Sequence, residues 1–123
     1  MSNENMMKSL RERAKEMTSR LPFMDGRDKG VTEDLIGSVI TIRDFGFLTD
    51  RDKSGKEKEY VVFTVDGIDK KFFFGGMVLT DQLRTLESEG YGDEIRAEGL
   101  PTLLTTKRAK SGMSYTNVEF YPE

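Results

Sequence analysis

The spacing of apolar residues divides the chain into a helical start and a longer β-rich remainder. Over residues 5–21, apolar side chains recur every three or four positions and charged ones lie between them, which predicts an amphipathic helix. Pro22 ends this helix. Residues 22–30 combine two glycines with four charged residues and are expected as a linker. We therefore divide the chain into an N-terminal arm and linker, residues 1–30, and a domain, residues 31–123.

From Leu35 onward the apolar residues alternate with a period of two, which is the period of a β-strand. Four stretches are rich in β-branched and aromatic residues, and each is expected as a strand: 35–47, 60–66, 70–74 and 114–121. A further strand is expected over residues 94–99, with residues 102–106 as its continuation after Pro101.

Between the third and fourth strands the period returns to that of a helix. Four apolar residues share one helical face over residues 77–89, and glycines follow at positions 90 and 92, so a helix is expected there. The predicted order is β-β-β-α-β-β after an amphipathic helical arm. This is the order of the five-stranded oligonucleotide-binding (OB) barrel, a mostly all-β fold. An SH3-like barrel is the alternative, but it does not account for the helix.

The composition excludes most catalytic chemistry. The chain has neither histidine nor cysteine, which removes the commonest general base, the commonest metal ligand and every thiolate site. The close carboxylate pairs Asp50/Asp52 and Asp66/Asp69 fall in expected turns, where such residues shape the backbone. We therefore expect no enzyme activity, no cofactor and no metal site.

The chain has no apolar run of the roughly 18 residues that a membrane span needs, so no membrane partner is expected. The N-terminal residues contain no apolar stretch of the kind found in signal peptides, which favours an intracellular location. We expect the cytoplasm, or the host cytoplasm if the protein is viral.

Charge is distributed unevenly along the chain. The formal net charge is −3 at pH 7, whereas nucleic-acid-binding domains usually carry a basic surface. Residues 103–115, however, contain Lys107, Arg108 and Lys110 and no acidic residue. The turn at residues 49–59 carries equal numbers of acidic and basic residues. An acidic barrel with one basic loop is therefore expected, and in OB barrels that loop flanks the ligand groove.

Binding of single-stranded nucleic acid needs aromatic faces for the bases and cations for the phosphates. Tyr60 lies on the opposite side of its expected strand from Phe63, and the three consecutive phenylalanines 72–74 cannot all face one core. Core packing is the alternative for each aromatic residue. The expected nucleic-acid-binding residues are Arg43, Phe45, Tyr60, Lys71, Phe73, Lys107, Arg108, Lys110 and Tyr115.

Four stretches of the chain, LIGSVITIRDFGF, YVVFTVDGIDKKFFFGGMVLTDQL, EIRAEG and KRAKSGMSYTNVEF, resemble the small OB-fold single-stranded-DNA-binding proteins of bacteriophages. The resemblance covers about residues 33–121 and rests on layout rather than on an invariant signature. It implies sequence-independent binding of single-stranded DNA, or of RNA, in phage replication or recombination.

Two features depart from that family. No acidic tail follows the last expected strand, which puts recruitment of partner proteins through such a tail in doubt. The arm is not part of the bare barrel, and it is expected either to pack on the barrel or to pair with another subunit in a homo-oligomer. The alternative function is a structural or protein-interaction OB barrel that binds no nucleic acid.

Overall fold

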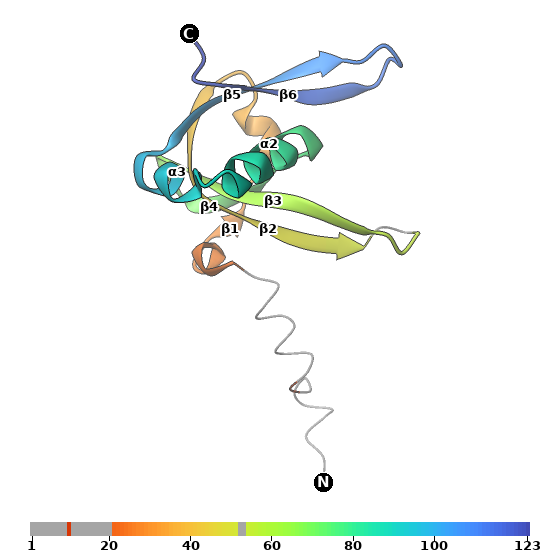
Figure 1. The fold of residues 1–123 in the computed structure, drawn as a ribbon. Coiled ribbons are helices and arrows are strands. Elements are labelled where there is room, and N and C mark those ends of the chain that lie inside the picture. Colours follow the sequence, from red (N-terminus) through yellow and green to blue (C-terminus); the bar gives the residue numbers. More distant parts are fainter. Residues whose placement is uncertain (1–9, 11–20, 52–53) are drawn as a thin grey trace.

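The structure is a computed structural model that describes residue 10, residues 21–51 and residues 54–123. The helix expected over residues 5–21 lies outside the described residues except at its last position and at Leu10. The described part is mostly β: six strands form one sheet in the order β1-β4-β3-β2-β5-β6. Two α-helices lie between β4 and β5 in the chain (Figure 1).

The strands and helices have the following bounds. The strands are β1 (Asp28–Lys29), β2 (Val39–Arg51), β3 (Glu57–Val65), β4 (Ile68–Phe74), β5 (Leu100–Arg108) and β6 (Ser114–Phe120). The α-helices are α2 (Met77–Ser88) and α3 (Gly92–Glu98). Two short 3-10 helices, η1 (Pro22–Met24) and η2 (Thr32–Leu35), precede β1 and β2. The helix expected over residues 77–89 is thus confirmed as α2.

Strand β2 holds the sheet together because it pairs with two neighbours. Its first half pairs with β5, from Val39 opposite Leu103 to Ile42 opposite Leu100. Its second half pairs with β3, from Phe45 opposite Phe63 outward. The register shifts between these halves, and such an irregularity lets a strand bend. The sheet does not close among the described residues, because β4 and β6 do not pair.

The strand expected over residues 94–99 is wrong, because residues 94–98 belong to helix α3. The alternation that suggested a strand rested on two apolar residues, and only Ile95 is buried. Asp93 and Glu94 lie in the first turn of α3, where negative charge favours a helix. Gly99 ends it with a φ of 84°, a conformation that favours glycine.

The main core lies between the sheet and α2. Its fully buried side chains come from four elements: Ile42 on β2, Phe63 on β3, Leu83 on α2 and Leu104 on β5. A buried hydrogen bond reinforces this packing, since the Val61 amide donates to Thr80 Oγ1 at 3.0 Å. Helix α2 is therefore attached to β3 by both packing and a polar contact.

Replacing Thr80 with valine is expected to lower the free energy of unfolding by about 1–3 kcal/mol, because the buried Val61 amide loses its acceptor. Urea unfolding followed by circular dichroism measures the change. Thr85→Val, on an exposed position of the same helix, is the matched control and should stay within about 0.5 kcal/mol of the wild type. Equal effects of the two variants would contradict this assignment.

A second, smaller cluster covers the outer face of β2, β3 and β4. Met24, Val62 and Phe72 are buried there, and five half-buried residues pack around them: Leu21, Phe23, Leu48, Tyr60 and Phe74. Strand β1 also pairs in parallel with β4. The interpretation of residues 22–30 as a linker is therefore wrong, because the segment's apolar side chains pack against the sheet. None of the described helices is long and apolar enough to span a membrane.

Candidate nucleic-acid interface

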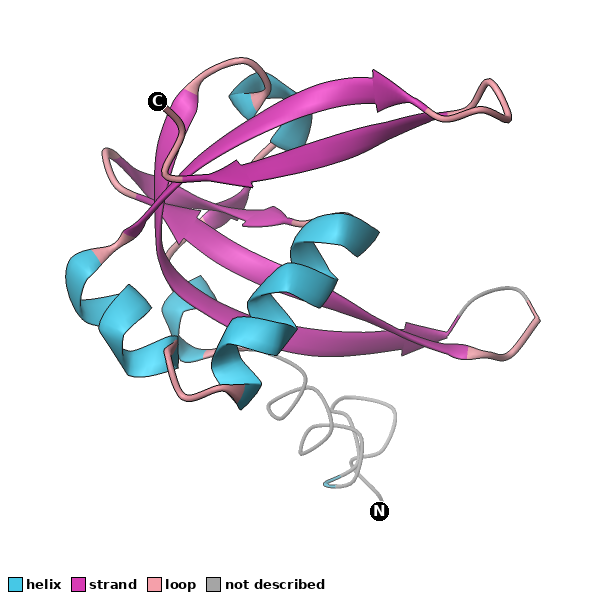
Figure 2. Cartoon of the chain, turned by 45° about the horizontal axis from the view of Figure 1, so that its top comes forward, coloured by secondary structure: helices cyan, strands magenta, loops and turns pink. Residues whose placement is uncertain are grey.

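Two long hairpins, β2–β3 and β5–β6, extend to the same side of the molecule with α2 between them (Figure 2). The surface between the hairpins is hollowed around Gly75 and Gly76, which line three hollows. The largest of these three, of about 590 Å³, lies between the β2–β3 hairpin and the start of α2. A hollow of about 250 Å³ continues from there to Tyr115 and Thr116 on β6. We call these connected hollows the inter-hairpin groove.

The β5–β6 hairpin borders this groove through Tyr115 and Thr116 and carries the basic cluster toward its tip; we call it the β5–β6 wall. Lys107 lies opposite Tyr115, and Arg108 lies opposite Ser114. The side chains of Lys107, Arg108, Lys110 and Tyr115 are all exposed, and no acidic residue lies between residues 103 and 115. The structure thus brings four of the nine expected residues together at one hairpin.

The β2–β3 hairpin forms a more acidic wall. The largest hollow is lined by four carboxylates and two cations: Asp50, Glu57, Glu59, Asp81, Arg51 and Lys58. The cations are partly neutralised, since Arg51 lies 3.8 Å from a carboxylate oxygen of Glu57. An anionic ligand is therefore attracted to the β5–β6 wall and repelled by the opposite one.

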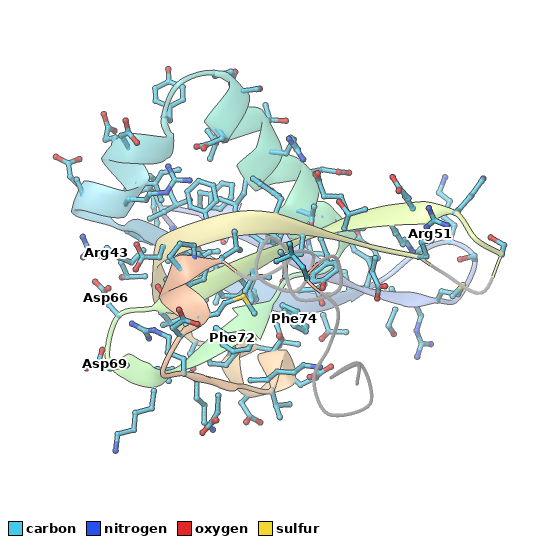
Figure 3. All side chains as sticks on the ribbon, turned by 90° about the horizontal axis from the view of Figure 1, so that it is seen from below. Arg43, Arg51, Asp66, Asp69, Phe72 and Phe74 are labelled. Carbon is cyan, nitrogen blue, oxygen red and sulfur yellow. The ribbon has the colours of Figure 1, made fainter. Side chains whose placement is uncertain are left out.

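Tyr60 lies at the acidic end of the groove, where it joins two phenylalanines on the outer face. Its ring meets that of Phe74 edge to face, with centroids 5.1 Å apart, and Phe74 lies 5.7 Å from Phe72. We call Tyr60, Phe72 and Phe74 the outer aromatic strip; Figure 3 labels the two phenylalanines. Burial, and secondarily the charge of Asp50, raises the pKa of Tyr60.

Phe45 and Phe73 do not reach the surface, so their expected role in base stacking is wrong. Each is only 2% exposed. Phe73 stacks on Phe63 inside the core, with centroids 5.8 Å apart. Phe45 packs beneath Arg96, whose guanidinium lies 4.4 Å from the ring centroid and donates to the Phe45 carbonyl at 3.2 Å.

Arg43 lies apart from the groove and is already paired. It donates two hydrogen bonds to Asp66, at 3.1 and 2.6 Å, and a third to the Ala97 carbonyl at 2.6 Å. Figure 3 shows Arg43 and Asp66 at the opposite end of the molecule from Arg51. The bond raises the pKa of Arg43 and lowers the pKa of Asp66. The structure therefore gives Arg43 a role in joining β2 to α3, away from the other expected residues.

Replacing Asp66 with asparagine is expected to lower the melting temperature by a few degrees at pH 7. Because pairing with Arg43 depresses the pKa of Asp66 in the folded state, its stabilisation is present above the unfolded-state pKa of about 3.9 and is lost as pH falls through the folded value. The difference between variant and wild type should therefore vanish on acidification. Melting curves from pH 7 to pH 2.5 test this, and a constant difference would contradict it.

Lys71 is exposed on β4 and lies opposite Asp28 of β1. The Lys71 carbonyl accepts a hydrogen bond from Arg27 at 3.3 Å. Lys71 therefore lies at the β1–β4 edge of the sheet, away from the β5–β6 wall.

Two residues at the exposed end of the outer aromatic strip, Phe74 and Lys29, were not among the residues expected from the sequence. Lys29 Nζ lies 4.7 Å from the centroid of the Phe74 ring, a cation–π contact. The signal for Phe74 was its alternation with Phe73, but alternation alone does not say which face is inside. Lys29 fell in the segment expected as a linker.

Among the residues that the structure describes, no group of three or more acidic side chains is placed to hold a metal ion. No protein family, curated protein sequence or solved structure matches the chain. A function is therefore inferred from the charged and aromatic side chains around the inter-hairpin groove.

Proposed function

We propose that the chain is an OB-fold protein that binds single-stranded DNA without catalysis and largely without regard to sequence. The strand order supports the fold: β4-β3-β2-β5-β6, with the helices α2 and α3 between β4 and β5, matches a partly open five-stranded barrel. In that fold, the loops after the first and fourth barrel strands flank the ligand. Here they are the tips of the two long hairpins.

The observation that carries the proposal is the exposed cluster of Lys107, Arg108 and Lys110, on the hairpin whose Tyr115 lines the inter-hairpin groove. Cations that follow the phosphates, together with aromatic faces for the bases, are what single-strand binders combine. Because the opposite wall is acidic, the phosphates are expected to follow the β5–β6 hairpin. The bases then point across Gly75 and Gly76 toward Tyr60.

The proposed role is coating of single strands in phage-type replication or recombination, which follows from the resemblance described above. Sequence independence follows from the groove, because stacking on Tyr115 or Tyr60 accepts any base.

Fluorescence anisotropy with a labelled dT oligomer of about 15 nucleotides, near the upper site size of one OB fold, tests the proposal. We expect binding that weakens steeply between about 50 and 200 mM salt, because phosphate contacts release counterions. A duplex of the same length, used as the control, should bind more weakly. Equal affinity for both, or no binding at low salt, would contradict the proposal.

The alternative is a barrel that binds a protein and no nucleic acid. The net charge of −3 and the acidic wall of the largest hollow favour it. An absence of DNA binding at low salt would favour this alternative over the proposal.

A further inference from the structure

The outer aromatic strip is covered by a neighbouring part of the same chain. Residues Leu21–Met24, which include the 3-10 helix η1, pack over the face that carries Tyr60, Phe72 and Phe74. Figure 3 shows the labelled phenylalanines beside this orange segment. Beneath it Val62 is fully buried and Phe72 is 7% exposed. Part of the outer aromatic strip is therefore already covered by Leu21–Met24.

The packing is tight at one end of this segment. Met24 is 5% exposed, and its sulfur accepts a hydrogen bond from the Leu21 amide at 3.4 Å. Leu21 rests on Gly46 of β2, where a Cβ atom would lie 2.8 Å from Leu21 Cδ2. Glycine at position 46 thus provides the space that Leu21 occupies.

The packing is looser at the other end. Tyr60 and Phe74 are only half-buried, as are Leu21 and Phe23. Tyr60 and Phe74 also line two hollows that meet at Gly75 and Gly76. The uncovered part of the strip is therefore continuous with the inter-hairpin groove.

A nucleobase that stacks on Phe72 would need the surface that Leu21–Met24 now cover, because stacking requires direct contact with a ring face. The covering segment and a base cannot occupy that surface together. We infer that Leu21–Met24 is an intramolecular cover that competes with nucleobases for the outer aromatic strip. A single strand in the groove contacts the covered part of the outer aromatic strip only in molecules whose cover has moved away. The apparent affinity is therefore the affinity of these open molecules multiplied by the fraction of molecules that are open.

This inference rests on the proposed function, and a reversible lock tests it. The chain has no cysteine, so a Leu21→Cys/Gly46→Cys variant has a single thiol pair. The Leu21 side chain already lies against the Cβ position of residue 46, with its Cγ 3.4 Å away, so the two residues are adjacent, as a disulfide requires. We expect the oxidised variant to bind the dT oligomer about tenfold more weakly than the reduced one. Equal affinity of the two forms would overturn the inference.

Wild-type protein under the same oxidising and reducing conditions is the control. If the wild type binds the oligomer and the disulfide does not change the affinity of the variant, the inferred cover is rejected while the proposed function stands. If the wild type does not bind at all, both fail. The two failures are thus distinguishable in one set of titrations.

A second variant acts from beneath the cover. Gly46→Val places a side chain against Leu21 without changing any residue of the outer aromatic strip. Circular dichroism verifies that the variant folds, and its affinity for the oligomer should rise about tenfold if the cover competes. A fall in affinity would mean that Leu21–Met24 contributes to the binding surface, which would overturn the inference.

Discussion

Replacing Lys107, Arg108 and Lys110 together with serine is expected to weaken binding of single-stranded DNA roughly 100-fold at 50 mM salt. Each phosphate contact with a single strand contributes about 0.7 to the slope of log affinity against log salt. Losing three contacts should therefore lower that slope by about 2, and the loss of affinity should shrink as salt rises. Anisotropy titrations at several salt concentrations measure both quantities.

The matched control changes the same net charge on the other hairpin. Arg51, Lys56 and Lys58 lie on the β2–β3 hairpin among acidic residues, and their replacement with serine should reduce affinity much less. Equal losses from the two triple variants would show that overall charge governs binding, rather than the β5–β6 wall.

Replacing Gly75 with alanine is expected to lower the free energy of unfolding by about 1–3 kcal/mol, the usual effect of overpacking a core. A Cβ atom at residue 75 would clash with Val61 Cγ1 and lie 3.0 Å from Leu79 Cδ2. Both of these side chains are buried, so the strain cannot be relieved toward solvent. The Gly75 amide also donates to the Val61 carbonyl at 2.8 Å, which holds residue 75 in place. Urea unfolding provides the measurement.

Gly76→Ala is the control for this prediction, because nothing lies within 4 Å of a Cβ atom at residue 76. Gly76 is the N-cap of α2, where alanine is less favourable than glycine, so a loss of up to about 1 kcal/mol is expected. A larger loss for Gly76→Ala than for Gly75→Ala would contradict the packing described here.

The strands and α2 could be predicted from the sequence because their patterns are long and their periods differ. The four apolar residues of residues 77–89 share a face only in a helix, and Leu79 and Leu83 are indeed buried on α2. The strand expected over 35–47 begins later, at Val39. Gly37 accounts for this shift, since its φ of 89° turns the chain between η2 and β2.

Three predictions were wrong because the sequence does not show which segments contact one another in the folded protein. The run 94–99 has too few apolar residues to distinguish a strand from a helix. Residues 22–30 look polar overall, yet Met24 is buried in one cluster with Val62 and Phe72, which lie far from it along the chain. For Phe45 and Phe73, alternation placed them on a face without showing that this face was the core.

The candidate site was predicted in part. The basic cluster could be found because three cations without a neighbouring acid stand out in any sequence, whatever the fold. Tyr60 was identified because its side chain is expected on the opposite face of the strand from Phe63. The covering segment and Lys29 were not found, because their contacts with the sheet depend on the parallel pairing of β1 with β4, and no local pattern encodes that pairing.

The central claim is that single-stranded DNA lies in the inter-hairpin groove against the β5–β6 wall. Titration of ¹⁵N-labelled protein with the dT oligomer, followed by amide chemical shifts, tests it most directly. We predict the largest shifts at residues 107–116 and 75–77, with smaller ones at Tyr60. Shifts confined to α3 and the exposed face of α2, or none at all, would contradict the account.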